Sequence, residues 1–253
     1  MKITIIGAGA AGLCSAIALR SQQPDADIQI LERSRADETP GLGIGLLPFS
    51  LSMIRMKGFE KYAPQFVPVG RMQEVFAGNA GKPEIVRKTR MQETQYTGVK
   101  RAVLISFLRE AVRNAGVNVT FGSEITEDSV RAAKESSDLV IGADGAGSVV
   151  RATFPKAFAP RVIDAKSRYA WLELEGGLDH FLFGYMYVAG RGLVRITAYP
   201  HSPNGGSSAI ITHSLGLTKY FDAPDMVDAE GEVSAHALED LNRIFAPGMP
   251  GKR

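Results

Sequence analysis

Three glycines near the N-terminus have the spacing of a phosphate-binding loop. Gly7, Gly9 and Gly12 form the pattern G-x-G-x-x-G within the stretch "IIGAGAAG". In this pattern the first glycine permits a tight turn, the second lets the backbone approach a pyrophosphate, and the third lets a helix and a strand pack closely. Ala10 and Ala11 follow at the expected helix N-terminus, whose free N–H groups and dipole favour anions. The stretch therefore predicts a site for the phosphates of a dinucleotide.

Glu32 is the candidate acceptor for a ribose. It lies 20 residues after Gly12, at the end of the next predicted strand. A carboxylate at this position accepts hydrogen bonds from a ribose diol and repels a 2′-phosphate, so it favours an adenosine ribose without one. The alternative interpretation is a surface glutamate that happens to follow a strand. The complete strand–helix–strand context favours the ribose acceptor.

A second glycine-rich turn carries another acid, in the stretch "DLVIGADGAGSVVR" at residues 138–151. Gly142 and Ala143 let the chain turn after an apolar strand, and Asp144 and Gly145 present a carboxylate and a backbone N–H. Ligands of open parallel sheets bind at the carboxyl ends of strands, which is where this turn is expected. The alternative, an ordinary strand-end turn rich in Asp and Gly, explains the glycines but gives the acid no role.

Arg101 is a candidate cation for the same ligand. It directly precedes a predicted helix that begins near Ala102. One interpretation lays its side chain against a cofactor phosphate, and the other makes it a solvated arginine at a helix start. The dipole at a helix N-terminus slightly disfavours a cation, which suggests an anion nearby. Position alone leaves both interpretations open.

Hydrophobic periodicity predicts the elements that must position these groups. Strands over Lys2–Ile6 and Asp27–Leu31 flank a helix over Ala10–Gln22, and this order specifies a parallel sheet with a right-handed crossover. An amphipathic helix is expected over Arg101–Asn114 and a buried strand over Asp138–Ile141. Further expected elements are a helix over Pro48–Lys57, a hairpin of Arg71–Phe76 and Glu84–Thr89, and a strand over Val117–Phe121.

From about residue 160 the sequence is rich in strand patterns and predicts an antiparallel sheet. The expected elements are strands over Tyr169–Leu174, Phe181–Val188, Leu193–Tyr199 and Ala209–His213, and a closing helix near Ala235–Phe245. Seven aromatic residues of these strands either line an aromatic substrate pocket or fill the core, and their alternating spacing favours the core. They are Tyr169, Trp171, Phe181, Phe183, Tyr185, Tyr187 and Tyr199.

Composition limits the partners and the compartment. A formal net charge of +2, with 22 % charged residues, gives no electrostatic case for nucleic acid or an anionic membrane. No apolar run reaches the roughly 18 residues of a membrane-spanning helix, and no signal peptide is visible, so a cytoplasmic location is expected. The single cysteine, Cys14, excludes an intrachain disulfide and is expected to be a small buried residue. No metal is expected, because metal-ligand spacing is absent among His180, His201, His213 and His236.

The combination of "GAGAAG", "LERS", "GVKRAVLISFLREA" and "DLVIGADGAGSVVR" resembles the FAD-dependent group A flavoprotein monooxygenases, the p-hydroxybenzoate-hydroxylase-like family. The later "YAWLELEG" and "RITAYPHS" are similar to one subgroup, the anthraniloyl-CoA and salicylyl-CoA hydroxylases and the violacein-pathway hydroxylase of tryptophan derivatives. The resemblance implies an α/β fold with a Rossmann-like FAD-binding domain of the glutathione-reductase type, at residues 1–68 and 95–158. It places an antiparallel substrate sheet and the closing helix at residues 69–94 and 159–253.

The resemblance also implies cofactor-binding roles for individual residues. The FAD pyrophosphate would be held by Gly7, Gly9, Ala10, Ala11 and Gly12, the adenosine part by Glu32 and Arg33, and the phosphates or ribityl chain by Arg101. The remaining implied contacts are Gly43, Ile44 and Gly45 at the isoalloxazine, Ile125 beside the cofactor, and Asp144 and Gly145 where flavin and NAD(P)H both pass. The implied reaction hydroxylates a small aromatic or indolic substrate, CoA-linked or carrier-linked substrates included, with FAD, NAD(P)H and O₂. It assigns no catalytic side chain in this sequence.

Two departures from the family pattern leave other functions open. The loop at residues 41–48 lacks the arginines that many members carry, and the family's second flavin motif, Gly-Asp-Ala-Ala-His, is absent together with the C-terminal helical part. The chain is therefore expected to be either a truncated or cleaved product of a longer enzyme or a naturally short relative with altered flavin binding, and a partner that supplies the missing C-terminal half is one further option. The alternatives are another flavin oxidoreductase of this fold, such as an NAD(P)H oxidase or reductase, and a non-catalytic or split-enzyme protein.

Overall fold

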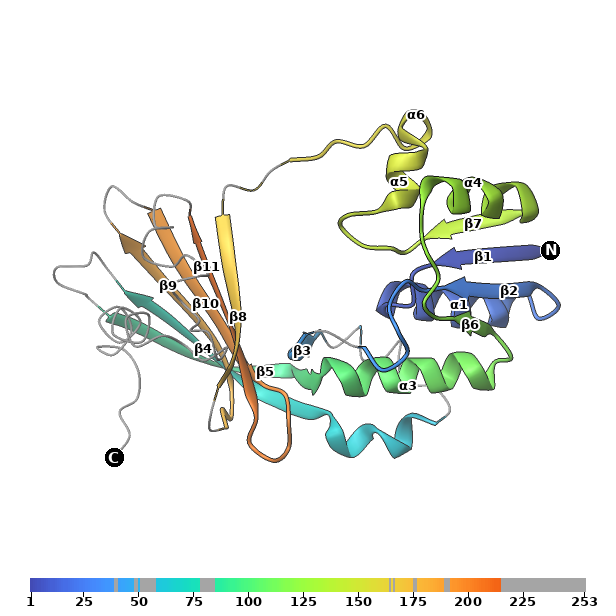
Figure 1. The fold of residues 1–253 in the computed structure, drawn as a ribbon. Helices are drawn as coiled ribbons and strands as arrows, with labels where there is room; N and C mark the ends of the chain where they lie inside the picture. Colours follow the sequence, from blue (N-terminus) through green and yellow to red (C-terminus); the bar gives the residue numbers. More distant parts are fainter. Residues whose placement is uncertain are drawn as a thin grey trace. The chain divides into compact units, whose positions relative to one another are not determined.

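The structure, a computed structural model, divides the chain into two compact units. Unit 1 comprises Met1–Gly41, Arg55–Ala63 and Arg101–Ile163, and unit 2 comprises Leu42–Ile54, Pro64–Lys100 and Asp164–Arg253. The chain therefore passes from unit 1 to unit 2 three times and returns to unit 1 twice, at Arg55 and at Arg101. Figure 1 shows the course of the chain. The residues that the structure describes are 1–38, 41–47, 50, 58–77, 85–163, 165, 167–174, 177–188 and 192–214.

Unit 1 is built on a parallel four-stranded sheet in the order β6-β2-β1-β7. Its strands are β1 (Lys2–Ile6), β2 (Asp27–Leu31), β6 (Asn118–Thr120) and β7 (Leu139–Gly142). β1 and β2 pair in parallel from Lys2↔Asp27 to Ile6↔Leu31, and helix α1 (Ala10–Gln22) connects them, which confirms the predicted strand–helix–strand unit. The core beneath it is fully buried and consists of Ile3, Ile5, Leu13, Ala16 and Ile30.

The other helices of unit 1 cover the sheet in two pairs. Helix α3 (Arg101–Asn114) has the predicted bounds and packs against α1, because its buried face carries apolar residues, among them Leu104 and Leu108. On the other side α4 (Glu127–Ser136) packs against α5 (Val149–Thr153), which is followed by α6 (Pro155–Phe158) (Figure 1). Val130 of α4 and Val150 of α5 form a buried cluster with Ile6 of β1. No helix of the described residues is long and apolar enough to cross a membrane.

The expectation of a buried strand at Asp138–Ile141 is only partly correct. A strand is present one residue further on, at Leu139–Gly142, but Leu139 is 40 % exposed and Val140 and Ile141 are half-buried. The reason is its place in the sheet, since β7 pairs with β1 on one side and with no strand of the described residues on the other. An apolar run of four residues does not distinguish a central strand from an edge strand.

Unit 2 contains a seven-stranded sheet in the order β3-β5-β4-β9-β10-β11-β8. All neighbouring strands are antiparallel except β4 and β9, which run parallel from Met72↔Phe181 to Ala77↔Met186. The strands are β3 (Gly43–Leu46), β4 (Val67–Ala77), β5 (Ile85–Lys100), β8 (Ser167–Leu174), β9 (Phe181–Val188), β10 (Gly192–Pro200) and β11 (Ser207–Ser214). The predicted hairpin is present as β4 and β5, both longer than expected, with an irregularity between Val69 and Arg71. Two short 3-10 helices, η1 (Phe59–Lys61) in unit 1 and η2 (Ala63–Gln65) after it, precede β4.

The aromatic residues of this sheet divide between core and surface. Phe181 and Tyr199 are buried, their rings stack with centroids 5.2 Å apart, and they form the centre of a core cluster in unit 2. Phe183 packs against this cluster. Tyr169 and Tyr187, in contrast, are 71 % and 56 % exposed. The core interpretation therefore holds for Phe181 and Tyr199 but not for Tyr169 and Tyr187.

Two predicted helices lie outside the described residues. The first is Pro48–Lys57, of which only Ser50 is described, and the second is the closing helix near Ala235–Phe245.

The close packing of α1 on β1 leads to a test of stability. A Cβ atom at Gly12 would lie 1.9 Å from the backbone oxygen of Gly7, so Gly12→Ala must push the helix from the strand. Although alanine gains about 1 kcal/mol of helix propensity over glycine, we expect a net loss of about 2 kcal/mol in the free energy of unfolding from overpacking. The matched control is Gly147→Ala, where a Cβ meets nothing within 4 Å, and which should change stability by less than about 0.5 kcal/mol. Urea unfolding of the two variants checks this, and equal stability of G12A and wild type would contradict it.

Candidate functional site

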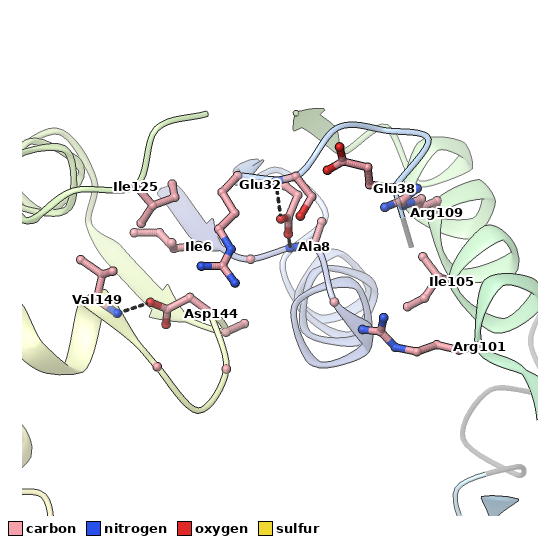
Figure 2. A pocket seen from close by; sticks show the side chains of 17 residues that line it. Ile6, Ala8, Glu32, Glu38, Arg101, Ile105, Arg109, Ile125, Asp144 and Val149 are labelled. Carbon is pink, nitrogen blue, oxygen red and sulfur yellow. Dashed lines mark hydrogen bonds between the residues drawn. The ribbon is translucent and has the colours of Figure 1, made fainter. Parts of the chain in front are cut away.

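A pocket of about 260 Å³ opens in unit 1 at the carboxyl ends of β1, β2 and β7 (Figure 2). This is the edge at which open parallel sheets bind their ligands. The lining residues are Ile6, Gly7, Ala8, Gly9, Glu32, Arg33, Ser34, Glu38, Arg101, Ile105, Arg109, Ile125, Ala143, Asp144, Gly145, Gly147 and Val149. Eight of the residues expected to bind a cofactor are among them: Gly7, Gly9, Glu32, Arg33, Arg101, Ile125, Asp144 and Gly145.

The glycine turn after β1 leaves the N-terminus of α1 open toward the pocket. Gly7 has φ +106°, and a Cβ there would lie 2.4 Å from the backbone oxygen of Ala143, so only glycine fits this turn. Gly9 is the N-cap of α1, makes no side-chain cap, and has open space where a Cβ would stand. The first turn of α1, which includes Ala10 and Ala11, contains no acidic residue. Its backbone N–H groups can therefore bind an anion.

The carboxylate of Glu32 is held in place by two backbone donors. Ala8 N–H donates to Oε2 at 2.6 Å, and Ser34 N–H donates to Oε1 at 2.8 Å (Figure 2). Partial burial raises the pKa of Glu32. The hydrogen bonds from Ser34 and Ala8 lower it by more than burial raises it, so the pKa lies below the usual value of 4.5. Glu32 is therefore ionised at neutral pH, and each of its oxygens keeps capacity to accept a hydroxyl.

Asp144 braces the second glycine-rich turn. Its Oδ1 accepts from Ser148 Oγ at 2.7 Å, and its Oδ2 accepts from the N–H of Val149 at 2.6 Å and of Val150 at 3.2 Å. The carboxylate thus binds the first N–H groups of α5, while Gly145 beside it has φ +84° and open space at its Cβ position. Asp144 orients the turn, and the backbone of Gly145 faces the pocket.

Two pocket residues on α3, Ile105 and Arg109, were missed by sequence reasoning. Arg101 is the first residue of α3, and Arg101, Ile105 and Arg109 follow one another at intervals of four. This spacing places them on one helix face, which borders the pocket in Figure 2. The signal was present in the sequence, but the apolar stripe of the same helix dominated the pattern. The other lining residues that were not predicted are Ile6, Ala8, Ser34, Glu38, Ala143, Gly147 and Val149.

Gly43, Ile44 and Gly45 belong to unit 2, where they form most of strand β3. Gly43 N–H donates to Ser208 Oγ at 2.9 Å, and the Tyr199 hydroxyl donates to the Gly43 carbonyl at 2.9 Å. A Cβ at Gly43 would lie 2.4 Å from the Cβ of His201, which is itself only 1 % exposed. The glycine is thus required by packing within unit 2, and its contact with a flavin stays a prediction.

Of the described histidines, His180 takes part in a polar cluster with Asp179 and Arg71. His180 Nδ1 lies 2.6 Å from Asp179 Oδ1, and Arg71 Nη2 donates to both Asp179 oxygens at 2.6 Å. The hydrogen bond from His180, with the charge of Arg71, lowers the pKa of Asp179, although partial burial opposes this. For His201, burial lowers the pKa of the imidazole. Among the described residues no group of three His, Cys, Asp or Glu side chains is placed to hold a metal ion, and His236 lies outside them.

Comparison with known proteins finds one hydroxylase and two monooxygenases among the relatives of this chain. The chain is 28 % identical to salicyloyl-CoA 5-hydroxylase of a Streptomyces species over 269 aligned positions, which cover 99 % of this chain and 47 % of that protein. Protodeoxyviolaceinate monooxygenase of Chromobacterium violaceum is 28 % identical and matches 68 % of this chain and 44 % of its own length. The 3-hydroxy-4-methyl-anthranilyl-[aryl-carrier protein] 5-monooxygenase of Streptosporangium sibiricum is 26 % identical over 81 % of this chain and 55 % of its length. The chain therefore spans about half the length of the curated relatives it matches.

Solved structures and a family model agree with this relationship. The fold is similar to that of 2-methyl-3-hydroxypyridine-5-carboxylic acid oxygenase, with a TM-score of 0.62 at 18 % identity, covering 97 % of this chain and 64 % of that one. This confirms the predicted fold class. The model of the family described as FAD binding domain matches residues 1–174, which include every residue that lines the pocket. Because that match extends over more than half of the sequence, the chain belongs to the FAD binding domain family.

Proposed function

We propose that this chain binds FAD and forms the FAD-binding and substrate-binding part of a monooxygenase that uses NAD(P)H and O₂ to hydroxylate an aromatic or indolic ring. The observation that carries the proposal is the convergence of three groups on one pocket. These are the open N-terminus of α1, the fixed carboxylate of Glu32, and the turn braced by Asp144. Together they match the phosphates and the ribose of a dinucleotide.

The residues of the pocket fit the ADP half of FAD in particular. The N–H groups after Gly9 would bind the pyrophosphate, and Glu32 would accept hydrogen bonds from the adenosine ribose. Arg101 adds a positive charge on the pocket wall for the phosphates or the ribityl chain. A pocket of about 260 Å³ suits a nucleotide rather than the whole of FAD. When bound, FAD supplies the electron transfer and oxygen chemistry, while the chain binds and orients it.

The two units are candidates for separate binding roles. We propose that unit 1 is the FAD-binding domain and that unit 2 is the substrate domain, with Gly43, Ile44 and Gly45 as its flavin-facing strand. The names of the relatives support the substrate class. Salicyloyl-CoA 5-hydroxylase and the anthranilyl-carrier monooxygenase are named for rings linked to CoA or to a carrier protein. We therefore propose a CoA-linked or carrier-linked aromatic substrate, and a cytoplasmic location in keeping with the single cysteine, Cys14.

A second candidate is a split enzyme that needs a partner for turnover. The observation that favours it is strand β7, whose outer edge pairs with no strand among the described residues and whose Leu139 is 40 % exposed. An unpaired edge beside a ligand pocket is a place where further chain can add to a sheet.

A third candidate is an NAD(P)H oxidase or reductase of the same fold.

Cofactor binding tests the proposal first. Wild-type protein titrated with FAD should quench flavin fluorescence with a saturable curve, and Glu32→Gln should weaken binding roughly tenfold or more, because it removes charge-assisted hydrogen bonds to the ribose. Glu135→Gln, an exposed glutamate of α4, is the matched control and should bind FAD as wild type does. Absence of FAD binding by the wild-type chain would overturn the proposal.

The lowered pKa of Glu32 predicts a pH-dependent difference in stability. Since its pKa in the folded state lies below the usual 4.5, ionised Glu32 stabilises the apo-protein above that pH, and the contribution is lost as the pH falls through the lowered value. The stability difference between wild type and E32Q should therefore be constant near neutrality and shrink below about pH 4.5. Thermal unfolding of both proteins without FAD, at a series of pH values, measures it. A difference that grows on acidification would contradict the hydrogen-bond geometry.

Turnover experiments separate the three candidates. FAD-loaded protein is given NADH or NADPH, O₂ and salicyloyl-CoA or anthraniloyl-CoA, and product and peroxide are measured. A product heavier by one oxygen, with little peroxide, is the expected result. Peroxide in proportion to NAD(P)H consumed, without hydroxylated product, would instead favour the oxidase. FAD binding without NAD(P)H oxidation, restored by a partner protein, would favour the split enzyme.

A further inference from the structure

Arg109 joins three segments of unit 1 that surround Glu32. It projects from α3 and lines the pocket (Figure 2). Its Nη1 donates to the carbonyl of Ala36 at 2.6 Å, in the segment that follows Glu32. Its guanidinium carbon lies 4.8 Å from the ring centroid of Phe121, which comes directly after β6. One side chain thus connects a helix, the segment after β2, and the segment after β6.

The two segments that Arg109 contacts are those that hold Glu32 in place. Glu32 N–H donates to the carbonyl of Thr120, and Ser123 N–H donates to the carbonyl of Glu32, both at 2.9 Å. Gly122 N–H donates to the carbonyl of Ser34 at 3.1 Å, and Ser34 N–H in turn donates to the Glu32 carboxylate. Phe121 lies in the chain between Thr120 and Gly122, which both take part in these backbone hydrogen bonds. Movement of either segment would therefore turn the carboxylate.

The electrostatics agree with this arrangement. The Nε of Arg109 is buried and has no hydrogen-bond partner within the described part of the chain, so the guanidinium is not simply solvated. Burial lowers the pKa of Arg109, the nearby Glu32 carboxylate raises it, and Arg101 lowers it. Arginine stays charged under these conditions. A planar guanidinium can lie over an aromatic ring and donate a hydrogen bond from its edge at the same time, which the ammonium of lysine cannot do.

We propose that Arg109 is a positioning residue that holds the Glu32 carboxylate in the orientation that accepts the adenosine ribose. The role rests on the proposed binding of FAD and goes beyond it, because Arg109 acts through Glu32 and not through its own contact with the ligand. The backbone ladder transmits the constraint, and the stacking on Phe121 fixes the direction of the guanidinium.

A double-mutant cycle tests whether Arg109 acts through Glu32. We expect Arg109→Gln to weaken FAD binding on the order of tenfold, and Arg109→Lys to restore little of the loss. In the E32Q background, the same R109Q change should alter FAD affinity by less than about twofold. Arg113→Gln, an exposed arginine on the same helix, is the control and should leave affinity unchanged. Equal losses from R109Q in both backgrounds would overturn the proposal.

A second measurement distinguishes positioning from general stability and does not require FAD. Wild-type protein should prefer ADP to its 2′,3′-dideoxy analogue, which lacks the ribose diol, and R109Q should reduce that preference severalfold while the apo-protein unfolds at the wild-type temperature within a few degrees. An unchanged preference in R109Q would overturn the role of Arg109. If the wild-type chain binds no FAD, the proposed function fails, and the ADP titrations alone then decide the role of Arg109.

Discussion

The close approach of two turns at the end of β1 is the constraint on which unit 1 depends. Gly7 adopts a left-handed backbone conformation against the carbonyl of Ala143, leaving no room for a Cβ. Hydrogen bonds fasten the turns on both sides, from Gly7 N–H to Leu31 and from Ala143 N–H to Ile6. This contact brings the start of α1, the end of β2 and the turn after β7 to one edge of the sheet. The pocket exists because these three strand ends meet there.

The sequence predicted the elements that are specified locally and missed those specified by tertiary contacts. The first strand–helix–strand unit was predicted with the bounds that the structure has, because apolar periodicity and the glycine spacing agree there. Strand β3 was expected to be a loop, since Gly43 and Gly45 lower strand propensity, and it forms through pairing with β5. Helix α4 is an exception, because its start is set locally by a Thr126–Ser129 capping box, and it was missed because the helix is short and polar.

The two pocket acids that the sequence predicts, Glu32 and Asp144, are held by backbone donors of the protein. Each accepts a backbone N–H at 2.6 Å, which fixes the orientation of its carboxylate, and the hydrogen bonds to Glu32 lower the pKa of that residue. For a carboxylate that acts as a general base, burial or a neighbouring like charge is expected to raise the pKa instead. In the proposed function, the site residues predicted from sequence therefore serve to bind and orient the cofactor. The periodic stripe Arg101, Ile105 and Arg109 was the one signal for the opposite wall of the pocket.

The order of the chain has a consequence for how the pocket forms during synthesis. Lys2 N–H bonds to the carboxylate of Asp138 across 136 residues, and the β1–β7 pairing at Ile3↔Leu139 has the same separation. The two halves of the pocket emerge from the ribosome at widely different times, with β4 and β5 of unit 2 made in between. Strand pairings between such distant residues form late in folding, because the entropy cost of closing the long loop comes before the pairing that offsets it. The β7-facing edge of β1 in the nascent chain therefore stays unpaired until residue 142 is available, and the pocket is completed only after β4 and β5 of unit 2 have been made.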